Sequence, residues 1–172
     1  MRVIQSHGLR LGDYMYYDRE KATAYAQQWG TKRNPAFYNF DGIGGDCTNF
    51  VSQCLYAGSG VMNFTRDIGW YYISANNRAA AWTGVEFLHK FLVNNKGIGP
   101  FGAPIPIEFV QAGDIIQLSY DGASFGHSLF IVETHPEIMV AQHSTGQNYA
   151  SRAFSSYLYE SFRTIHIEGV RK

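Results

Sequence analysis

A cysteine and a histidine that could together carry out nucleophilic catalysis each begin a predicted element. The cysteine begins a helix and the histidine begins a strand. Cys47 follows Gly44 and Gly45 and opens an apolar helical pattern. The helix dipole favours a thiolate in the first turn, and the amides there have no partner within the helix, so they can donate to an oxyanion. Cys47 is therefore predicted to be a nucleophile; the alternative is a small buried apolar residue.

A thiol nucleophile needs a general base, and the base needs a group that holds its ring. Among six histidines, His127 follows Gly126 and begins a strongly apolar segment, where an imidazole is costly without a partner. A three-residue turn at 134–136 would place His127 directly opposite His143, on one face of a sheet. A shift of one residue would break this pairing. The prediction is His127 as base and His143 as its orienting group, with Asn148 as the fallback.

Other polar residues near Cys47 have more than one interpretation. The oxyanion hole is expected to use the Cys47 N–H and one side-chain donor, for which Tyr38 is the candidate; the alternative is that Tyr38 only packs. Gly45 would allow a substrate backbone to approach closely. Asp46 is expected to cap the helix by accepting backbone N–H bonds. Cys54, in the middle of the same helix, is expected to be structural.

Helices are predicted in the first half of the chain. A helix over residues 18–29 is indicated by apolar residues with helical spacing, and a loop covers 34–45. A second helix covers 47–57 and ends near Gly58. A third begins with a capping-box pattern at 83–86. The apolar face of the first helix consists of Ala22, Tyr25, Ala26 and Trp29.

Strands are predicted in the second half. The segments 115–120, 127–133, 138–143 and 162–167 are rich in apolar residues and are separated by turn signals such as Asp121-Gly122. Because helices come first and strands second, the order indicates an α+β fold with N-terminal helices packed on an antiparallel sheet.

Composition narrows the functional classes. The 172 residues are 45% hydrophobic and 16% charged, with a formal net charge of +0, so one globular domain over residues 1–172 is expected and nucleic-acid binding is not. No apolar run is long enough to span a membrane, and residues 1–11 lack the apolar core of a signal peptide. The expected location is the cytoplasm, or a domain of a larger exported protein. The oligomeric state is open.

From residue 18 to 132 the chain resembles the amidase domain of the NlpC/P60 and CHAP-like cysteine hydrolases. The resemblance rests on the run GDCTNFVSQ at 45–53 and, more weakly, on YDR, NP, GDII and GHS at 17–19, 34–35, 113–116 and 126–128. It implies a papain-like fold, a nucleophile at Cys47, a base at His127 and a third polar residue on the next strand, His143. Relatives cut amide or peptide bonds in bacterial cell walls, so a peptide or peptidoglycan substrate is expected, without a cofactor.

Three other functions remain open at this point. The same thioester could transfer its acyl group to an amine instead of water. Cys47, His127 and His143 could be zinc ligands, although their spacing is long and no CxxC or HExxH motif accompanies them, so no metal is expected. The chain could also be a binding module on a hydrolase scaffold, because a fold does not determine a function.

Overall fold

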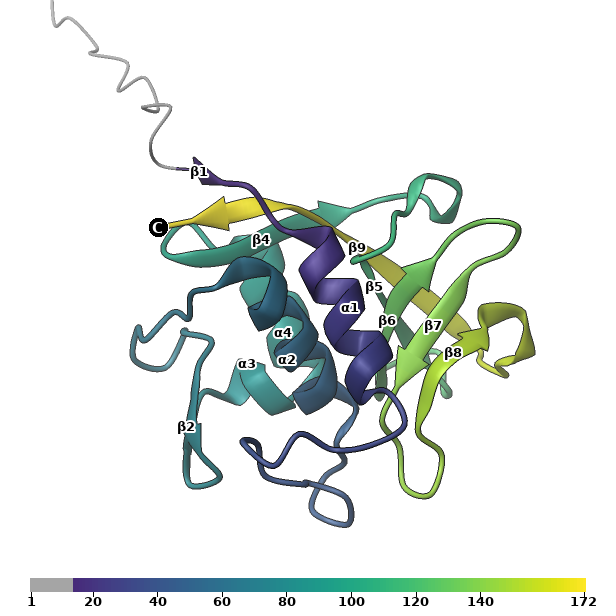
Figure 1. The fold of residues 1–172 in the computed structure, drawn as a ribbon, viewed down its shortest axis with the longest axis horizontal. Coiled ribbons are helices and arrows are strands. Elements are labelled where there is room, and N and C mark those ends of the chain that lie inside the picture. Colours follow the sequence, from purple (N-terminus) through teal and green to yellow (C-terminus); the bar gives the residue numbers. More distant parts are fainter. Residues whose placement is uncertain (1–13) are drawn as a thin grey trace, which may run out of the picture.

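The computed structural model describes residues 14–172, in which a layer of helices packs against one antiparallel sheet (Figure 1). The segment 1–11, in which no signal peptide was expected, lies outside the described residues. None of the helices in the described part of the chain has the length and apolar character that crossing a membrane requires.

Helix α1 (Arg19–Trp29) confirms the first predicted helix. The Asp18 side chain caps it by accepting the Lys21 N–H at 3.0 Å, and Ala22 and Ala26 form its buried face. Their small side chains let α1 lie close to the next helix along the chain, consistent with the apolar spacing in the sequence.

Helix α2 (Cys47–Ser59) begins at the predicted residue and ends two residues later than predicted. Gly60, with φ +70°, stops it in the left-handed conformation, and its N–H donates to the Tyr56 carbonyl at 2.8 Å. Gly58 continues the helix and packs closely against Tyr17. A short helix α3 (Ala80–Thr83) precedes α4 (Val85–Asn94).

The capping box predicted at 83–86 is wrong. Thr83 is the last residue of α3, and its hydroxyl accepts a hydrogen bond from Arg78 at 3.0 Å. Gly84 occupies the cap position of α4 without a side-chain bond. Glu86 instead accepts the Phe125 N–H at 2.9 Å, which ties α4 to the loop before His127. The sequence pattern of a capping box is present, but the side chains of Thr83 and Glu86 form hydrogen bonds with Arg78 and Phe125 instead of with the first turn of α4.

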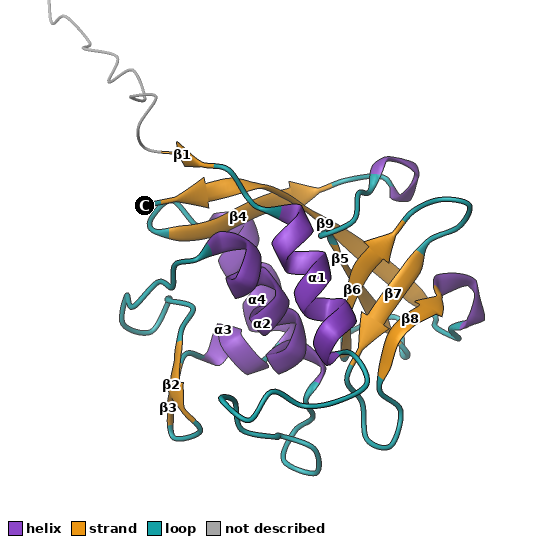
Figure 2. Cartoon of the chain, viewed as in Figure 1, coloured by secondary structure: helices purple, strands orange, loops and turns teal. Residues whose placement is uncertain are grey.

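The main sheet has seven antiparallel strands within residues 14–172 (Figure 2). Its order is β1-β9-β5-β6-β7-β8, and β4 also pairs with β9. All four predicted strands are present. The bounds are β1 (Tyr14–Met15), β4 (Gly99–Pro104), β5 (Ile115–Ser119), β6 (His127–Glu133), β7 (Met139–Gln142), β8 (Tyr149–Ala153) and β9 (Ser161–Arg171), with a separate hairpin of β2 (Tyr72–Ser74) and β3 (Asn77–Arg78).

The register between β6 and β7 contradicts the predicted pairing of His127 with His143. Phe130 lies opposite Ala141, and the register shifts between Ile131 and Glu133. Extended toward the start of β6, this register places His143 opposite Ser128, one residue from the predicted partner. Because side chains alternate across a strand, this single step puts His127 and His143 on opposite faces of the sheet.

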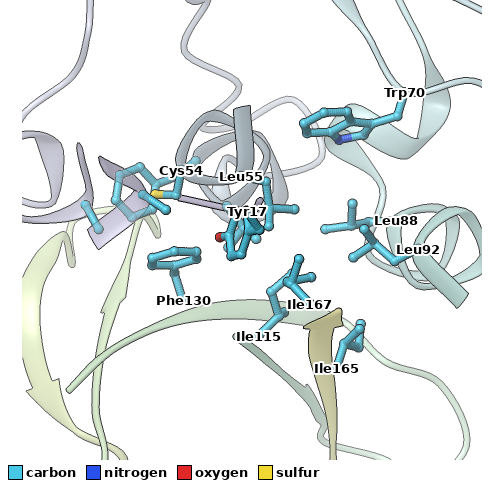
Figure 3. Packing of buried hydrophobic residues seen from close by; sticks show 14 of the residues in the cluster. Tyr17, Cys54, Leu55, Trp70, Leu88, Leu92, Ile115, Phe130, Ile165 and Ile167 are labelled. Carbon is cyan, nitrogen blue, oxygen red and sulfur yellow. The ribbon is translucent and has the colours of Figure 1, made fainter. Parts of the chain in front are cut away.

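The two faces of the sheet have separate apolar cores. The face toward the helices buries Phe130, Ile115 and Ile165 against α2 and α4 (Figure 3). The opposite face buries a second cluster in which Leu129 and Val140 are fully buried. Each such side chain stabilises the fold by roughly 1.5–3 kcal/mol. The two clusters hold β6 and β7 in place, and with them the start of β6 and the end of β7.

A buried carboxylate ties α1 to the sheet. Arg19 donates to Asp114 at 2.8 Å, and the same carboxylate accepts the Ile167 N–H at 3.0 Å and lies 2.9 Å from His166. Asp114 is fully buried. These contacts give the segments YDR and GDII, which carry the resemblance, a structural role in docking the first helix.

Candidate active site

Cys47 stands at the first position of α2, and its side chain is partly exposed. The preceding loop turns through Gly42, Gly44 and Gly45, with φ values of 78°, 87° and 99°, a region that other residues rarely adopt. A Cβ built on Gly44 or Gly45 would meet no atom within 4 Å. The loop therefore carries no side chain at these two positions, and no hydrogen-bond acceptor within residues 14–172 occupies the Cys47 amide.

His127, the first residue of β6, interacts with the Cys47 thiol. Burial would raise the pKa of Cys47, but the hydrogen bond and charge of His127, the Ser128 N–H and the Thr48 hydroxyl outweigh it and lower that pKa. Burial alone would lower the pKa of His127, whereas Cys47 and then Gln142 raise it. Opposite shifts in the two groups favour a thiolate beside an imidazolium.

Gln142, the last residue of β7, holds the His127 ring. His127 Nε2 lies 2.9 Å from Gln142 Oε1, and Gln142 Nε2 donates to the Gln147 carbonyl at 2.8 Å. Because a carbonyl only accepts, the Gln142 amide must point its oxygen at the ring. His127 Nε2 therefore carries a hydrogen, and Nδ1 is the nitrogen left for Cys47.

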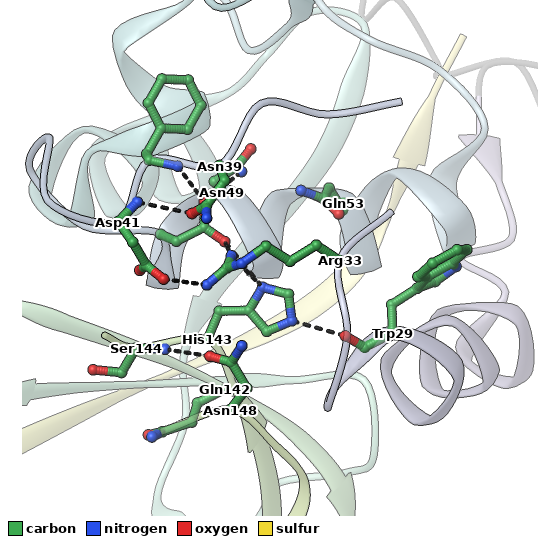
Figure 4. Close-up of polar contacts among 12 residues, drawn as sticks. Trp29, Arg33, Asn39, Asp41, Asn49, Gln53, Gln142, His143, Ser144 and Asn148 are labelled. Carbon is green, nitrogen blue, oxygen red and sulfur yellow. Dashed lines mark hydrogen bonds and ion pairs between the residues drawn. The ribbon is translucent and has the colours of Figure 1, made fainter. Parts of the chain in front are cut away.

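His143 faces the helices and does not contact His127. Its Nδ1 lies 2.9 Å from Asp46 Oδ2, and its Nε2 lies 2.8 Å from the Trp29 carbonyl (Figure 4). The ring stacks on Phe50 with centroids 4.0 Å apart. The expectation that His143 orients His127 is corrected by this geometry, and the cause is the one-residue difference in register. Gln142, its neighbour in sequence, occupies the expected place.

Asp46 does not cap α2 with its side chain, contrary to expectation. Its Oδ1 accepts the Phe40 N–H at 2.9 Å and the Asn49 side chain at 2.8 Å, while Oδ2 pairs with Arg33 and His143. Burial would raise the pKa of Asp46, but these partners outweigh it and lower that pKa. The carboxylate therefore anchors the glycine loop to the start of α2.

Arg33 completes this network by pairing with Asp41 as well as Asp46 (Figure 4). Its guanidinium lies between the two carboxylates and 3.2 Å from His143 Nδ1. The positive charge balances Asp46, which adjoins Cys47 in sequence and would otherwise disfavour a thiolate. Sequence reasoning missed Arg33, because nothing in the loop pattern 34–45 indicates which cation would reach Asp46.

Comparison with protein families adds to this geometry. A family model described as "Putative amidase domain" matches residues 16–167. The chain belongs to this amidase domain family. It is also 33% identical over 124 residues, 70% of its length, to the Uncharacterized protein YhbB of Bacillus subtilis (strain 168). The chain spans 39% of the length of that relative. No solved structure matches the chain significantly.

The remaining candidates, Tyr38 and Asn148, form hydrogen bonds with other residues and, within residues 14–172, none with Cys47 or His127. Tyr38 is 47% exposed, its ring lies edge-on to Phe40, and its carbonyl accepts the Asn49 side chain at 2.9 Å. Asn148 accepts the Ser144 N–H at 3.1 Å and so closes the turn between β7 and β8. Cys54 is fully buried in the core, where burial raises its pKa well above the usual value.

The zinc alternative is not favoured by the arrangement of these side chains. Cys47 and His127 interact, but His143 is turned away toward Asp46. Within residues 14–172, no group of three or more histidine, cysteine or acidic side chains is placed to hold a metal ion.

Proposed function

We propose that this amidase domain is a cysteine hydrolase of amide or peptide bonds with a papain-like arrangement of its site. Cys47 is the nucleophile, His127 the acid and base, and Gln142 the positioning residue. The observation that carries the proposal is the interaction of the Cys47 thiol with the His127 ring, with the pKa of the thiol lowered and that of the imidazole raised. A cysteine serving only as a core residue would resemble Cys54, whose pKa is raised.

The first half of the reaction forms a thioester. His127 Nδ1 takes the thiol proton, and Sγ of Cys47 attacks the carbonyl carbon of the substrate. The Cys47 N–H, which is free at the first turn of α2, donates to the oxygen that becomes negative. Tyr38 is the proposed second donor, because its exposed ring stands on the loop that leads into α2. The imidazolium then protonates the leaving amine as the C–N bond breaks.

The second half releases the acid. Water enters from the open side of the glycine loop, His127 removes one of its protons, and the resulting hydroxide attacks the thioester carbonyl. The C–S bond breaks, the thiolate returns and the carboxylic acid leaves. The bond from His127 Nε2 to Gln142 holds the ring in one orientation through both halves. Arg33 and His143 do not touch the substrate in this scheme. Arg33 neutralises the charge of Asp46, and His143 holds the Asp46 carboxylate in place.

We propose a bacterial cell-wall peptide as the substrate, acted on in the cytoplasm or as part of a larger exported protein. The family description supports amide hydrolysis, and the motif resemblance supports the wall. The test is to digest purified peptidoglycan and casein side by side and to identify the products by mass spectrometry, with Cys47→Ala as the inactive control.

Free stem peptides from peptidoglycan, absent with Cys47→Ala, would support the proposal. Cleavage of casein alone would overturn the cell-wall substrate, and no cleavage of either would overturn the hydrolase for these substrate classes. A parallel digest with added glycinamide distinguishes acyl transfer, because a transferase would join the acyl fragment to that amine.

A further inference from the structure

The face of the sheet that bears His127 continues across β7 and β8 as a row of polar and aromatic side chains. Gln142 lies opposite Tyr149, and Val140 lies opposite Arg152. Because paired residues share a face, Tyr149 and Arg152 lie on the same side of the sheet as Gln142. His127, Gln142 and Tyr149 thus follow one another across three neighbouring strands.

Arg152 is held in place without an acid to neutralise it. Its guanidinium carbon lies 4.8 Å from the centroid of the Tyr149 ring and 4.6 Å from that of Tyr157, and its Nε donates to the Ser156 hydroxyl at 2.9 Å. No carboxylate within residues 14–172 forms an ion pair with it. The half-buried arginine Arg33, in contrast, has two carboxylate partners.

Contacts connect this cluster to the candidate nucleophile and base. The Tyr157 hydroxyl donates to Gln142 Oε1 at 2.7 Å, the same oxygen that holds His127. Burial and then the charge of Cys47 raise the pKa of Tyr120. Burial raises the pKa of Tyr157, and the charge of Tyr120 raises it further. The cluster therefore lies beside the reacting pair, on the side of His127.

We propose that Arg152, framed by Tyr149 and Tyr157, binds a carboxylate in the amine half of the substrate. This rests on the proposed function, in which His127 protonates the leaving amine and so stands on the amine side of the bond being cut. A planar guanidinium with a fixed Nε can receive a carboxylate through charge-assisted bonds. The substrate class is then an amide whose amine half is an amino acid or short peptide with a free carboxylate.

Binding is tested first, without any need for catalysis. Cys47→Ala protein labelled with nitrogen-15 is titrated with glycylglycine and with glycylglycine amide, which differ only in the carboxylate. The nuclear magnetic resonance signal of the Arg152 Nε–H should shift saturably with glycylglycine, at least tenfold more tightly than with its amide. Adding Arg152→Gln should abolish the preference, read from backbone signals of β8, whereas Arg152→Lys should retain part of it.

Arg66→Gln is the matched control, because Arg66 is 95% exposed, lies on the loop between α2 and β2, and its replacement removes the same charge. It should leave the preference unchanged. Equal binding of the two dipeptides, no binding of either, or an unchanged preference in folded Arg152→Gln protein would overturn the carboxylate site. Backbone spectra of each variant show whether it is folded.

Activity is measured second, with a peptide that the wall digest shows to be cut, synthesised with a free carboxylate or a carboxamide in the amine half. The peptide with the free carboxylate should have a kcat/KM at least tenfold higher than the carboxamide. In Arg152→Gln this ratio should fall near one, mainly because KM for the carboxylate peptide rises. If the digests yield no cut peptide although glycylglycine binds through Arg152, the hydrolase proposal fails and the carboxylate site stands. If peptides are cut without a preference, the carboxylate site fails and the hydrolase stands.

Discussion

His127 Nε2 and Gln142 Oε1 lie 2.9 Å apart at the ends of two neighbouring strands, β6 and β7. The Gln147 carbonyl orients the Gln142 amide, so this one contact determines which ring nitrogen of His127 carries the hydrogen. It leaves Nδ1 as the nitrogen available to Cys47, which a proton transfer from the thiol would use.

Gln142→Ala should lower kcat/KM on the order of 100-fold, since the ring of His127 would lose the partner that holds its tautomer and orientation. The measurement is the pH profile of kcat/KM, in which the limb belonging to His127 should move, together with the melting temperature. His143→Ala is the comparison variant and should lower the melting temperature while leaving the shape of that profile. If the limb moved in His143→Ala and stayed in place in Gln142→Ala, His143 would be the orienting group.

Cys47→Ala and Cys47→Ser should each abolish hydrolysis while the fold remains intact, because the nucleophile is removed from a partly exposed site. Cys54→Ala should retain activity and lose about 1 kcal/mol of stability, because it leaves a small void in the core. Rates and urea unfolding of the three variants check this. An inactive but folded Cys54→Ala protein would refute the assignment of the nucleophile.

Alkylation of Cys47 by iodoacetamide should remain fast at pH values below the usual titration range of a cysteine thiol. The reason is that His127 and neighbouring donors lower the pKa of Cys47, and only the thiolate reacts. In His127→Ala the opposing effect of burial is left, so the inflection of rate against pH should move upward. An inflection at the same pH in both proteins would contradict a coupled pair. Cys47→Ala establishes the background from Cys54.

Asp46→Asn should destabilise the fold by about 3 kcal/mol at neutral pH, because it leaves the Arg33 charge without the buried one of its two carboxylate partners. The folded-state pKa of Asp46 is lowered, so its stabilising contribution is present above the unfolded value near 4 and is lost as pH falls through the folded value. Urea unfolding between pH 7 and 3 checks this: the gap between parent and variant should narrow below about pH 4. A constant gap would show that the charge is not what stabilises the loop.

Much of the fold follows from local signals in the chain. The apolar spacing of α1, the glycines before Cys47 and the four apolar strands each depend on residues close together in sequence. The edge strand β8 and the strand β4, with the sequence GPFGAP, were missed. Their residues have little strand propensity of their own, and neighbouring strands supply the pairing that makes them extended.

The sequence by itself determined the helical start at Cys47, the strand start at His127 and the α+β order of elements, because helix dipoles, glycine conformations and apolar periodicity act over a few residues. Only the tertiary structure decided that Gln142 and not His143 meets His127, and that Arg33 meets Asp46. A register shift within one strand pair reverses which side chain faces which layer, and it depends on how both faces of the sheet pack.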